Sequence, residues 1–371
     1  MKQKEKTVKK QMLLMLFLIF SLVSVIAADE PLGVFANLET NSVQFIDPMT
    51  NTVSDPLLKG QLGNYFGGLL DVVITSDGNT AIVSNFFDAR LYFLDISGGF
   101  NTEPTILGFV WINMFAEDMA ITPDDKYVLV TDGGQASNIA IVDVPNRAFV
   151  RIKGLGEAGV QCIVIAPDGR NVYAADFWGA YIYRLTLDAD GYMKFEQSVD
   201  VLPHWPTNLA ISPDGRTLFA VDAFHLKSPV FSINDRGRLI LEEYVRMPAR
   251  NGQSCIFSSD GTKAYLQTNE TIRGRQVHIL DVTGPGQVSP SGVSISLNRR
   301  GDGDGFFGVD TLAIDPSGNY LYVTNPSDIG AEAGIFVIDL YLNTIVDYLR
   351  TKGRPTGIAF TSITNGNGFL F

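Results

Sequence analysis

The sequence predicts an all-β fold, a seven-bladed β-propeller built from four-stranded antiparallel blades. Two apolar segments flank a short turn in six copies along the chain, and "ISPDGRTLFAVD" at 211–222 is one of them. A repeat of about 45 residues with four short strands is typical of propeller blades. The 36 glycines and 17 prolines in 371 residues also favour a fold rich in turns. The turn residues recur at steps of 47, 44, 46, 46 and 57 residues, at Asp77, Asp124, Asp168, Asp214, Asp260 and Ser317.

Each copy divides into four strands, named A to D in chain order. Strands A and B flank the turn, strand C is a segment such as "YFLD" (92–95) or "FVID" (336–339), and strand D is more polar. Asp and Gly suit the A–B hairpin because Asp accepts backbone hydrogen bonds and Gly adopts positive φ.

The seventh copy is split between the two ends of the chain. Residues 34–58 contain strands B, C and D but no strand A, whereas "PTGIAFTSI" (355–363) is a strand A by itself. Pairing the C-terminal strand with the N-terminal three would close the ring and leave no open edge. We therefore expect 34–58 and 355–363 to form the closing blade of one domain over residues 29–371.

Residues 1–28 have the pattern of a secretory signal peptide. Five lysines precede an apolar run of 15 residues at 12–26, followed by Ala27 and Ala28. The run is shorter than the ~20 residues that cross a bilayer, which disfavours the alternative of an uncleaved anchor helix. We expect cleavage near Ala27 or Ala28 and an exported protein, periplasmic or extracellular, that does not span the membrane afterwards.

The formal net charge of −12 makes nucleic acid an unsuitable partner, because an acidic surface repels phosphate backbones. The two cysteines, Cys162 and Cys255, fall two blades apart and one register position apart. A disulfide needs Cα atoms within ~7 Å, so both are expected to be buried reduced thiols.

Two positions of the repeat are polar in most copies, and we call the aligned residues at each position a polar column. Each column has a structural and a functional interpretation. Every strand B ends in Asn or Asp, and we expect these side chains to cap backbone amides, because a ring of ligands would need asymmetry. Asp71 and Asp118 open strand A in neighbouring blades, and we expect solvated carboxylates at the channel mouth, with a cation site as the alternative.

The unusual residues fall mostly in the B–C loops and D–A links, which share one face of a propeller. Exposed aromatic and arginine side chains anchor interfaces, so we predict a protein-binding face there. The alternative is that the rings plug the channel or pack on neighbouring loops. The predicted partner-binding residues are Phe86, Phe87, Trp111, Trp178, His204, Trp205, His225, Arg273, Arg275, Phe306 and Phe307.

The segment "GDGDGFFGVD" (301–310) partly matches a calcium loop through Asp302, Asp304 and Asp310. It lacks the bidentate Glu of an EF-hand, and Arg299 and Arg300 flank it, so an ion-paired surface insertion is favoured over calcium binding. No other cofactor is expected. The three histidines, His204, His225 and His278, are not spaced as metal ligands in the sequence, and no catalytic residue can be nominated.

Units such as "LAISPDGRTLFAVD" (209–222) and "LAIDPSGNYLYVTN" (312–325), the latter ending in "YVTN", resemble the YVTN-repeat family and lactonase-like seven-bladed propellers. The resemblance extends over 34–363 and implies the fold more strongly than an activity. Similar rings include sugar-acid lactonases, amine dehydrogenase heavy chains, haem-free subunits of periplasmic complexes and surface-layer proteins.

The favoured function is therefore an exported, non-catalytic binding or scaffold protein, a cofactor-free subunit of a periplasmic complex, redox complexes included. The alternatives are a lactonase-like hydrolase, in which His204 and His225 would act with Arg273 or Glu117, and a cell-surface repeat protein.

Overall fold

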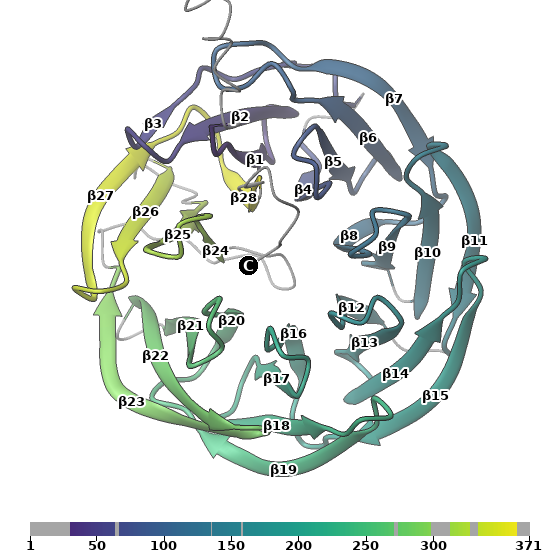
Figure 1. Ribbon diagram of the computed structural model, residues 1–371, viewed down its shortest axis with the longest axis vertical. Helices are drawn as coiled ribbons and strands as arrows, with labels where there is room; N and C mark the ends of the chain where they lie inside the picture. The colour runs from purple at the N-terminus through teal and green to yellow at the C-terminus, as the bar shows by residue number, and fades with distance from the viewer. Residues whose placement is uncertain are drawn as a thin grey trace, which may run out of the picture.

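The computed structural model describes residues 30–63, 67–134, 136–156, 159–270, 274–297, 312–326 and 333–361. These residues form seven four-stranded antiparallel sheets arranged as blades of a ring, and no helix (Figure 1). The first strand of each blade lies nearest the centre and the last lies on the outside (Figure 1). The predicted seven-bladed propeller is confirmed.

Blade 1 consists of β4 (Leu69–Ile74), β5 (Thr80–Asn85), β6 (Arg90–Asp95) and β7 (Thr105–Trp111). Blade 2 consists of β8 (Ala116–Ile121), β9 (Tyr127–Asp132), β10 (Asn138–Asp143) and β11 (Ala148–Gly154). Blade 3 consists of β12 (Val160–Ile165), β13 (Asn171–Asp176), β14 (Tyr181–Leu187) and β15 (Met193–Asp200). Blade 4 consists of β16 (Pro206–Ile211), β17 (Thr217–Asp222), β18 (Lys227–Ile233) and β19 (Leu239–Arg246). Blade 5 consists of β20 (Gly252–Phe257), β21 (Lys263–Glu270), β22 (Gly274–Gly284) and β23 (Gln287–Ser296). Blade 6 consists of β24 (Leu312–Ile314), β25 (Tyr320–Asn325), β26 (Gly334–Asp339) and β27 (Thr344–Arg350).

Blade 7 closes the ring with strands from both ends of the chain, in the order β28 (Pro355–Phe360), β1 (Gly33–Asn37), β2 (Ser42–Asp47) and β3 (Thr52–Val53). Gly33 lies opposite Phe360, and a Cβ at Gly33 would lie 2.6 Å from the Phe360 ring, so a larger residue there would require that ring to shift. The Leu32 N–H donates to Thr361 Oγ1 at 2.9 Å. The predicted closing blade is therefore present.

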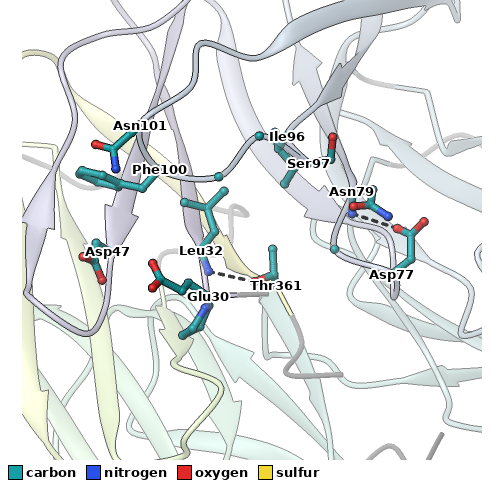
Figure 2. Close-up of a pocket in the computed structure, with 14 residues that line it drawn as sticks. Glu30, Leu32, Asp47, Asp77, Asn79, Ile96, Ser97, Phe100, Asn101 and Thr361 are labelled. Carbon is teal, nitrogen blue, oxygen red and sulfur yellow. Dashed lines mark hydrogen bonds between the residues drawn. The ribbon is translucent and has the colours of Figure 1, made fainter. Parts of the chain in front are cut away.

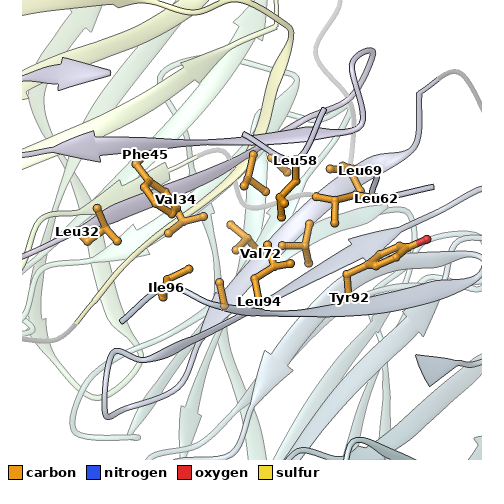
Figure 3. Close-up of a cluster of buried hydrophobic side chains, with 14 residues drawn as sticks. Leu32, Val34, Phe45, Leu58, Leu62, Leu69, Val72, Tyr92, Leu94 and Ile96 are labelled. Atoms are coloured by element: carbon orange, nitrogen blue, oxygen red, sulfur yellow. The ribbon is translucent and has the colours of Figure 1, made fainter. Parts of the chain in front are cut away.

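The core lies between the blades. Seven clusters of buried apolar side chains occupy the seven boundaries between adjacent blades. Figure 3 shows one of them, in which Val34 and Phe45 of blade 7 lie beside Val72 and Leu94 of blade 1. Because inner strands are covered on both faces, strands such as β5 are buried almost throughout, whereas in the outer β7 exposed residues alternate with half-buried or buried ones.

The polar column near the start of strand A joins consecutive blades. Each strand A carries a register shift against strand B at this point, in blades 1 to 5. The side chain accepts a hydrogen bond from a backbone N–H of the next blade. The four bonds are Met119 N–H to Asp71 Oδ2 (2.9 Å), Ile163 N–H to Asp118 Oδ2 (2.8 Å), Leu209 N–H to Cys162 Sγ (3.0 Å) and Cys255 N–H to Asn208 Oδ1 (3.1 Å).

This arrangement corrects the expectation of solvated carboxylates. Asp71 and Asp118 are each 1% exposed, and they bind backbone amides rather than water at a channel mouth. The column at the end of strand B caps backbone amides in blades 1 to 4, as predicted, whereas in blade 6 Asn325 Oδ1 accepts from the Arg275 guanidinium. Asp176 Oδ1 accepts from the Gly179 N–H at 2.7 Å, and Asn85 Oδ1 accepts from the Asp88 N–H at 3.0 Å.

Within the described part of the chain no helix has the length and apolar character needed to cross a membrane. The predicted signal peptide, residues 1–28, lies outside the described residues.

Candidate functional site

The B–C loops and D–A links lie on one rim of the ring, which we call the loop rim. The A–B and C–D turns lie on the other, the turn rim, because strands in each blade alternate in direction. All three tryptophans are on the loop rim, as the sequence predicted. Trp111 ends β7, Trp178 lies between β13 and β14, and Trp205 directly precedes β16. Trp111 is 62% exposed and Trp178 is 65% exposed, whereas Trp205 is half-buried.

Trp178 and Trp205 belong to a continuous series of ring contacts that runs from blade 3 to blade 4. We call this series the aromatic row. Its successive centroid distances are 4.9, 6.0, 5.7, 5.5, 5.1 and 4.7 Å, within the range of stabilising ring pairs. In order, the aromatic row consists of Trp178, Phe177, Phe224, Trp205, His225, His204 and Tyr244.

Asp222, the last residue of β17, organises one end of the aromatic row. Its Oδ1 accepts hydrogen bonds from the backbone N–H groups of Phe224 and His225, each at 2.7 Å. Its Oδ2 lies 2.5 Å from His204 Nδ1 and 3.3 Å from His225 Nδ1. Two imidazoles therefore converge on one buried carboxylate, an arrangement suited to holding protons or a metal ion.

A second aromatic group lies on the loop rim between blades 1 and 2. Phe86 stacks on Phe115 with centroids 4.9 Å apart and contacts Phe87 edge-on at 5.1 Å. Phe87 is 54% exposed and Phe115 is 46% exposed. These rings present apolar surface to solvent beside the link that leads into β8.

Glu117 of β8 is buried close to Phe86, since a Cβ placed on Gly133 would contact both side chains. Burial raises the pKa of Glu117 to about 8, and the nearby Asp132 carboxylate adds to the shift. Glu117 Oε2 has no hydrogen-bond partner among the described residues. Its carboxyl group can thus keep its proton near neutral pH and donate or accept one there.

Arg275 does not lie on a binding surface. It is 1% exposed, and its guanidinium donates to Asn325 Oδ1 at 2.5 Å and to the Thr324 carbonyl oxygen at 2.8 Å. Arg275 therefore joins blade 5 to blade 6, and we leave it out of the candidate site. The predicted partner residues Arg273, Phe306 and Phe307 and the predicted calcium ligands Asp302, Asp304 and Asp310 lie outside the described residues.

Sequence reasoning missed several members of the two aromatic groups. Phe115, Phe177 and Phe224 adjoin predicted positions in the same loops and links, so loop membership alone could have identified them. The sequence pattern places Asp222 only in the column at the end of strand B. Tyr244 lies inside β19, and nothing in the sequence pattern indicates that it stacks on His204.

The turn rim also exposes large side chains, so the predicted segregation of aromatic residues is incomplete. Tyr192 is 55% exposed and Tyr341 is 90% exposed, and both lie in C–D turns. Three grooves between adjacent blades open on this rim, and each is lined by the turns that repeat around the ring.

Figure 2 shows the groove at the junction of blades 7 and 1, with a volume of about 280 Å³. Its lining includes Asp47, Asp77, Phe100 and Thr361. The Asn79 N–H donates to Asp77 Oδ1 at 2.9 Å within the A–B turn that forms one wall. Because such grooves recur between blades, we interpret them as a consequence of the architecture.

Both cysteines are buried reduced thiols, as predicted. Cys162 Sγ accepts the Leu209 N–H at the boundary of blades 3 and 4, and burial raises the pKa of the Cys255 thiol. His278 is buried within β22, where its Nε2 lies 2.9 Å from Thr268 Oγ1 and its Nδ1 lies 2.6 Å from Ser294 Oγ. These residues contribute to the packing of the blades.

No protein-family model and no curated protein matches the chain, so the YVTN-repeat resemblance is not confirmed by a family model. Many solved structures share the fold. A functionally unknown protein from Desulfotomaculum acetoxidans is 19% identical, with a TM-score of 0.76 over 89% of this chain and 99% of that chain. The periplasmic gluconolactonase of Pseudomonas aeruginosa is 16% identical, with a TM-score of 0.70 over 90% and 99%. Hydrazine synthase of Kuenenia stuttgartiensis is 21% identical, with a TM-score of 0.60 over 76% and 87%. At these identities the similarity shows the fold alone.

Proposed function

We propose that this protein is an exported, non-catalytic β-propeller that binds a protein partner through its loop rim, as a cofactor-free subunit of a periplasmic complex. The main observation that supports this proposal is the exposed aromatic surface on that rim, where Trp111, Trp178 and Phe87 are each more than half exposed. Exposed aromatic side chains are costly in water and are enriched at the centres of protein interfaces.

The ring provides a stiff support for such a surface. Phe177 and Phe224 fix Trp178 and Trp205 by edge contacts, so a partner would meet rings that are already ordered. A pre-ordered surface loses little side-chain entropy on binding. The net charge of −12 favours a partner with a basic or neutral contact surface over nucleic acid. The chain shares its fold with hydrazine synthase of Kuenenia stuttgartiensis.

The test begins with isolation of the native protein from its own cells, with its neighbours kept associated, and identification of a stoichiometric partner. Affinity is then measured between the purified pair for the wild type, Trp111→Ala and Trp178→Ala. Loss of an aromatic anchor typically costs 2 kcal/mol or more, so we expect Kd to rise by at least about thirty-fold for one of the two variants.

Tyr341→Ala is the matched control, because Tyr341 is an exposed aromatic residue on the turn rim. Its affinity should equal that of the wild type. Isolation as a monomer without a partner, or equal affinity in the tryptophan variants and the wild type, would contradict the proposal.

A lactonase-like hydrolase is the second candidate. Glu117, with its pKa raised to about 8, is a carboxyl group suited to general acid or base catalysis near neutral pH. Hydrolysis of a lactone adds water to the acyl carbon, breaks the ring C–O bond and releases one proton from the resulting acid. Proton release from glucono-δ-lactone in a pH-stat measures this directly, against the spontaneous rate. Activity that exceeds the spontaneous rate and falls in Glu117→Gln would support the hydrolase; a rate equal to the spontaneous one excludes that substrate.

A further inference from the structure

Two imidazoles and one carboxylate meet on the loop rim, where the aromatic row passes from the link before β16 to the β17–β18 loop. We propose that His204, Asp222 and His225 bind a divalent transition-metal ion of the Zn²⁺ class. The ligand atoms would be the Nδ1 atoms of both histidines and Oδ2 of the aspartate. This site goes beyond the proposed partner binding, does not depend on it, and replaces the expectation that the chain binds no cofactor.

The three ligand atoms already have nearly the spacing that a metal needs. Each of the three residues offers one ligand atom within 4.8 Å of the ligand atoms of the other two. Zinc ligands at bond lengths of ~2.0–2.1 Å in a tetrahedral site lie roughly 3.4 Å apart. His225 Nδ1 is 3.3 Å from Asp222 Oδ2, which fits that spacing. His204 Nδ1 is 2.5 Å from Oδ2, so these two atoms must separate by roughly 1 Å when an ion binds.

The surroundings hold each ligand in place. Two backbone N–H groups bind Asp222 Oδ1, Oδ2 contacts both imidazoles, and His225 Nδ1 lies 3.3 Å from either oxygen. His204 stacks on Tyr244 with an interplanar angle of 21°, and His225 stacks on Trp205 with an angle of 9°. Groups that orient the ligands in this way are a regular feature of protein metal sites.

The equivalent positions of other blades do not repeat this arrangement of side chains. The requirements of the propeller fold therefore do not explain it. The equivalent residue of the preceding blade, Asp176, accepts hydrogen bonds from the Gly179 N–H and the Tyr183 hydroxyl. In blade 1, Asn85 contacts the Leu62 carbonyl and the Asp88 N–H. Histidines approach Asp222 but none of these counterparts, and among the described residues no other group of His, Cys, Asp and Glu has metal-binding geometry. Capping alone therefore does not require the two imidazoles.

The donor atoms and the exposure define the kind of ion. Two imidazole nitrogens with one carboxylate oxygen favour Zn²⁺ and its neighbours, whereas Ca²⁺ and Mg²⁺ prefer oxygen ligands alone. The His225 side chain is 36% exposed, in contrast to 0% for Asp222. An ion can thus enter beside His225, and solvent can complete its coordination there.

The test is calorimetric titration of the tag-free chain with ZnCl₂ after removal of bound metal by EDTA. We expect one Zn²⁺ per chain. Asp222→Asn keeps the backbone cap but removes the charge, and His225→Ala removes a partly exposed ligand, so each should weaken binding at least about ten-fold. Asp176→Asn is the matched control, since it makes the same change in the preceding blade, and its affinity should equal that of the wild type.

Absence of saturable Zn²⁺ binding in the wild type would overturn the proposal, as would equal affinities in the wild type, Asp222→Asn and His225→Ala, or an equal loss in Asp176→Asn. X-ray absorption at the zinc edge on the wild-type protein provides a test that needs no variant. Two imidazole ligands are expected in its coordination shell, and a shell of oxygen atoms alone would refute the assignment.

Discussion

Asp118 in blade 2 accepts a hydrogen bond from the Ile163 N–H of blade 3 at 2.8 Å, deep in the ring. Equivalent bonds join blades 1 and 2, 3 and 4, and 4 and 5, through an aspartate, a cysteine and an asparagine. The repeat therefore conserves the geometry of an acceptor facing the next blade while the residue type changes. These bonds add direction to the apolar packing between blades, which by itself has none.

Removal of this acceptor should destabilise the ring. In Asp118→Ala the buried Ile163 N–H loses its partner, and an unsatisfied buried amide costs ~1–3 kcal/mol. Asp118→Asn retains an oxygen acceptor and should lose less. Urea unfolding followed by intrinsic fluorescence measures both; equal stability of Asp118→Ala and the wild type would show that the bond contributes nothing.

Truncation after Arg354 should open the ring. It removes β28, and with it the pairing to β1 and the hydrogen bonds from Thr356 Oγ1 to the carbonyls of Ala36 and Leu69. The exposed edge of β1 should cause aggregation, and the loss of one buried strand should cost several kcal/mol. Light scattering and thermal unfolding are the measurements.

A truncation after Thr364 is the control, because it retains β28. It should remain monodisperse under the same conditions. A soluble, cooperative protein that ends at Arg354 would show that blade 7 does not need its innermost strand.

Glu117→Gln should stabilise the protein at neutral and alkaline pH but not at acidic pH. The unfolded carboxyl ionises near 4.5, whereas the folded one keeps its proton up to about 8, so wild-type stability falls as pH rises between these values. At ~1.4 kcal/mol per pKa unit the full effect is at most roughly 4–5 kcal/mol. Melting temperatures of both proteins should agree near pH 4 and diverge toward pH 8; a constant difference would contradict the buried-acid interpretation.

Both thiols should be inert in the native protein. Cys162 and Cys255 are buried, and burial raises the pKa of Cys255, which keeps the reactive thiolate scarce. A thiol reagent should label neither residue in buffer and both in denaturant. Rapid labelling under native conditions would indicate that the blade boundaries open.

Much of the architecture could be predicted because its determinants are local and repeated. The Asp77 turn illustrates this: the Asn79 N–H donates to Asp77 Oδ1, and Gly78 has φ of +72°, both encoded by three adjacent residues. The split seventh blade followed from the same periodicity. The burial of Asp71 and Asp118 was missed because their amide partners belong to other blades.

The candidate site, too, could be predicted only in part from the sequence. The tryptophans could be placed on the loop rim because each loop's position follows from strand order. The burial of Arg275 could not be predicted, since an arginine in a loop and one spanning two blades look alike in sequence. Likewise, Glu117 gives no sign of its raised pKa until the packing of Phe86 and Gly133 is known.

The amino-acid sequence by itself determined the number of blades, the turn chemistry, the joining of the two chain ends and the rim that carries the tryptophans, because each depends on short-range patterns repeated along the chain. Only the tertiary structure decided that His204 and His225 approach Asp222, and that the polar column near the start of strand A links consecutive blades. Side-chain convergence depends on how loops from adjacent strands and blades pack, and no periodicity in one chain encodes those distances.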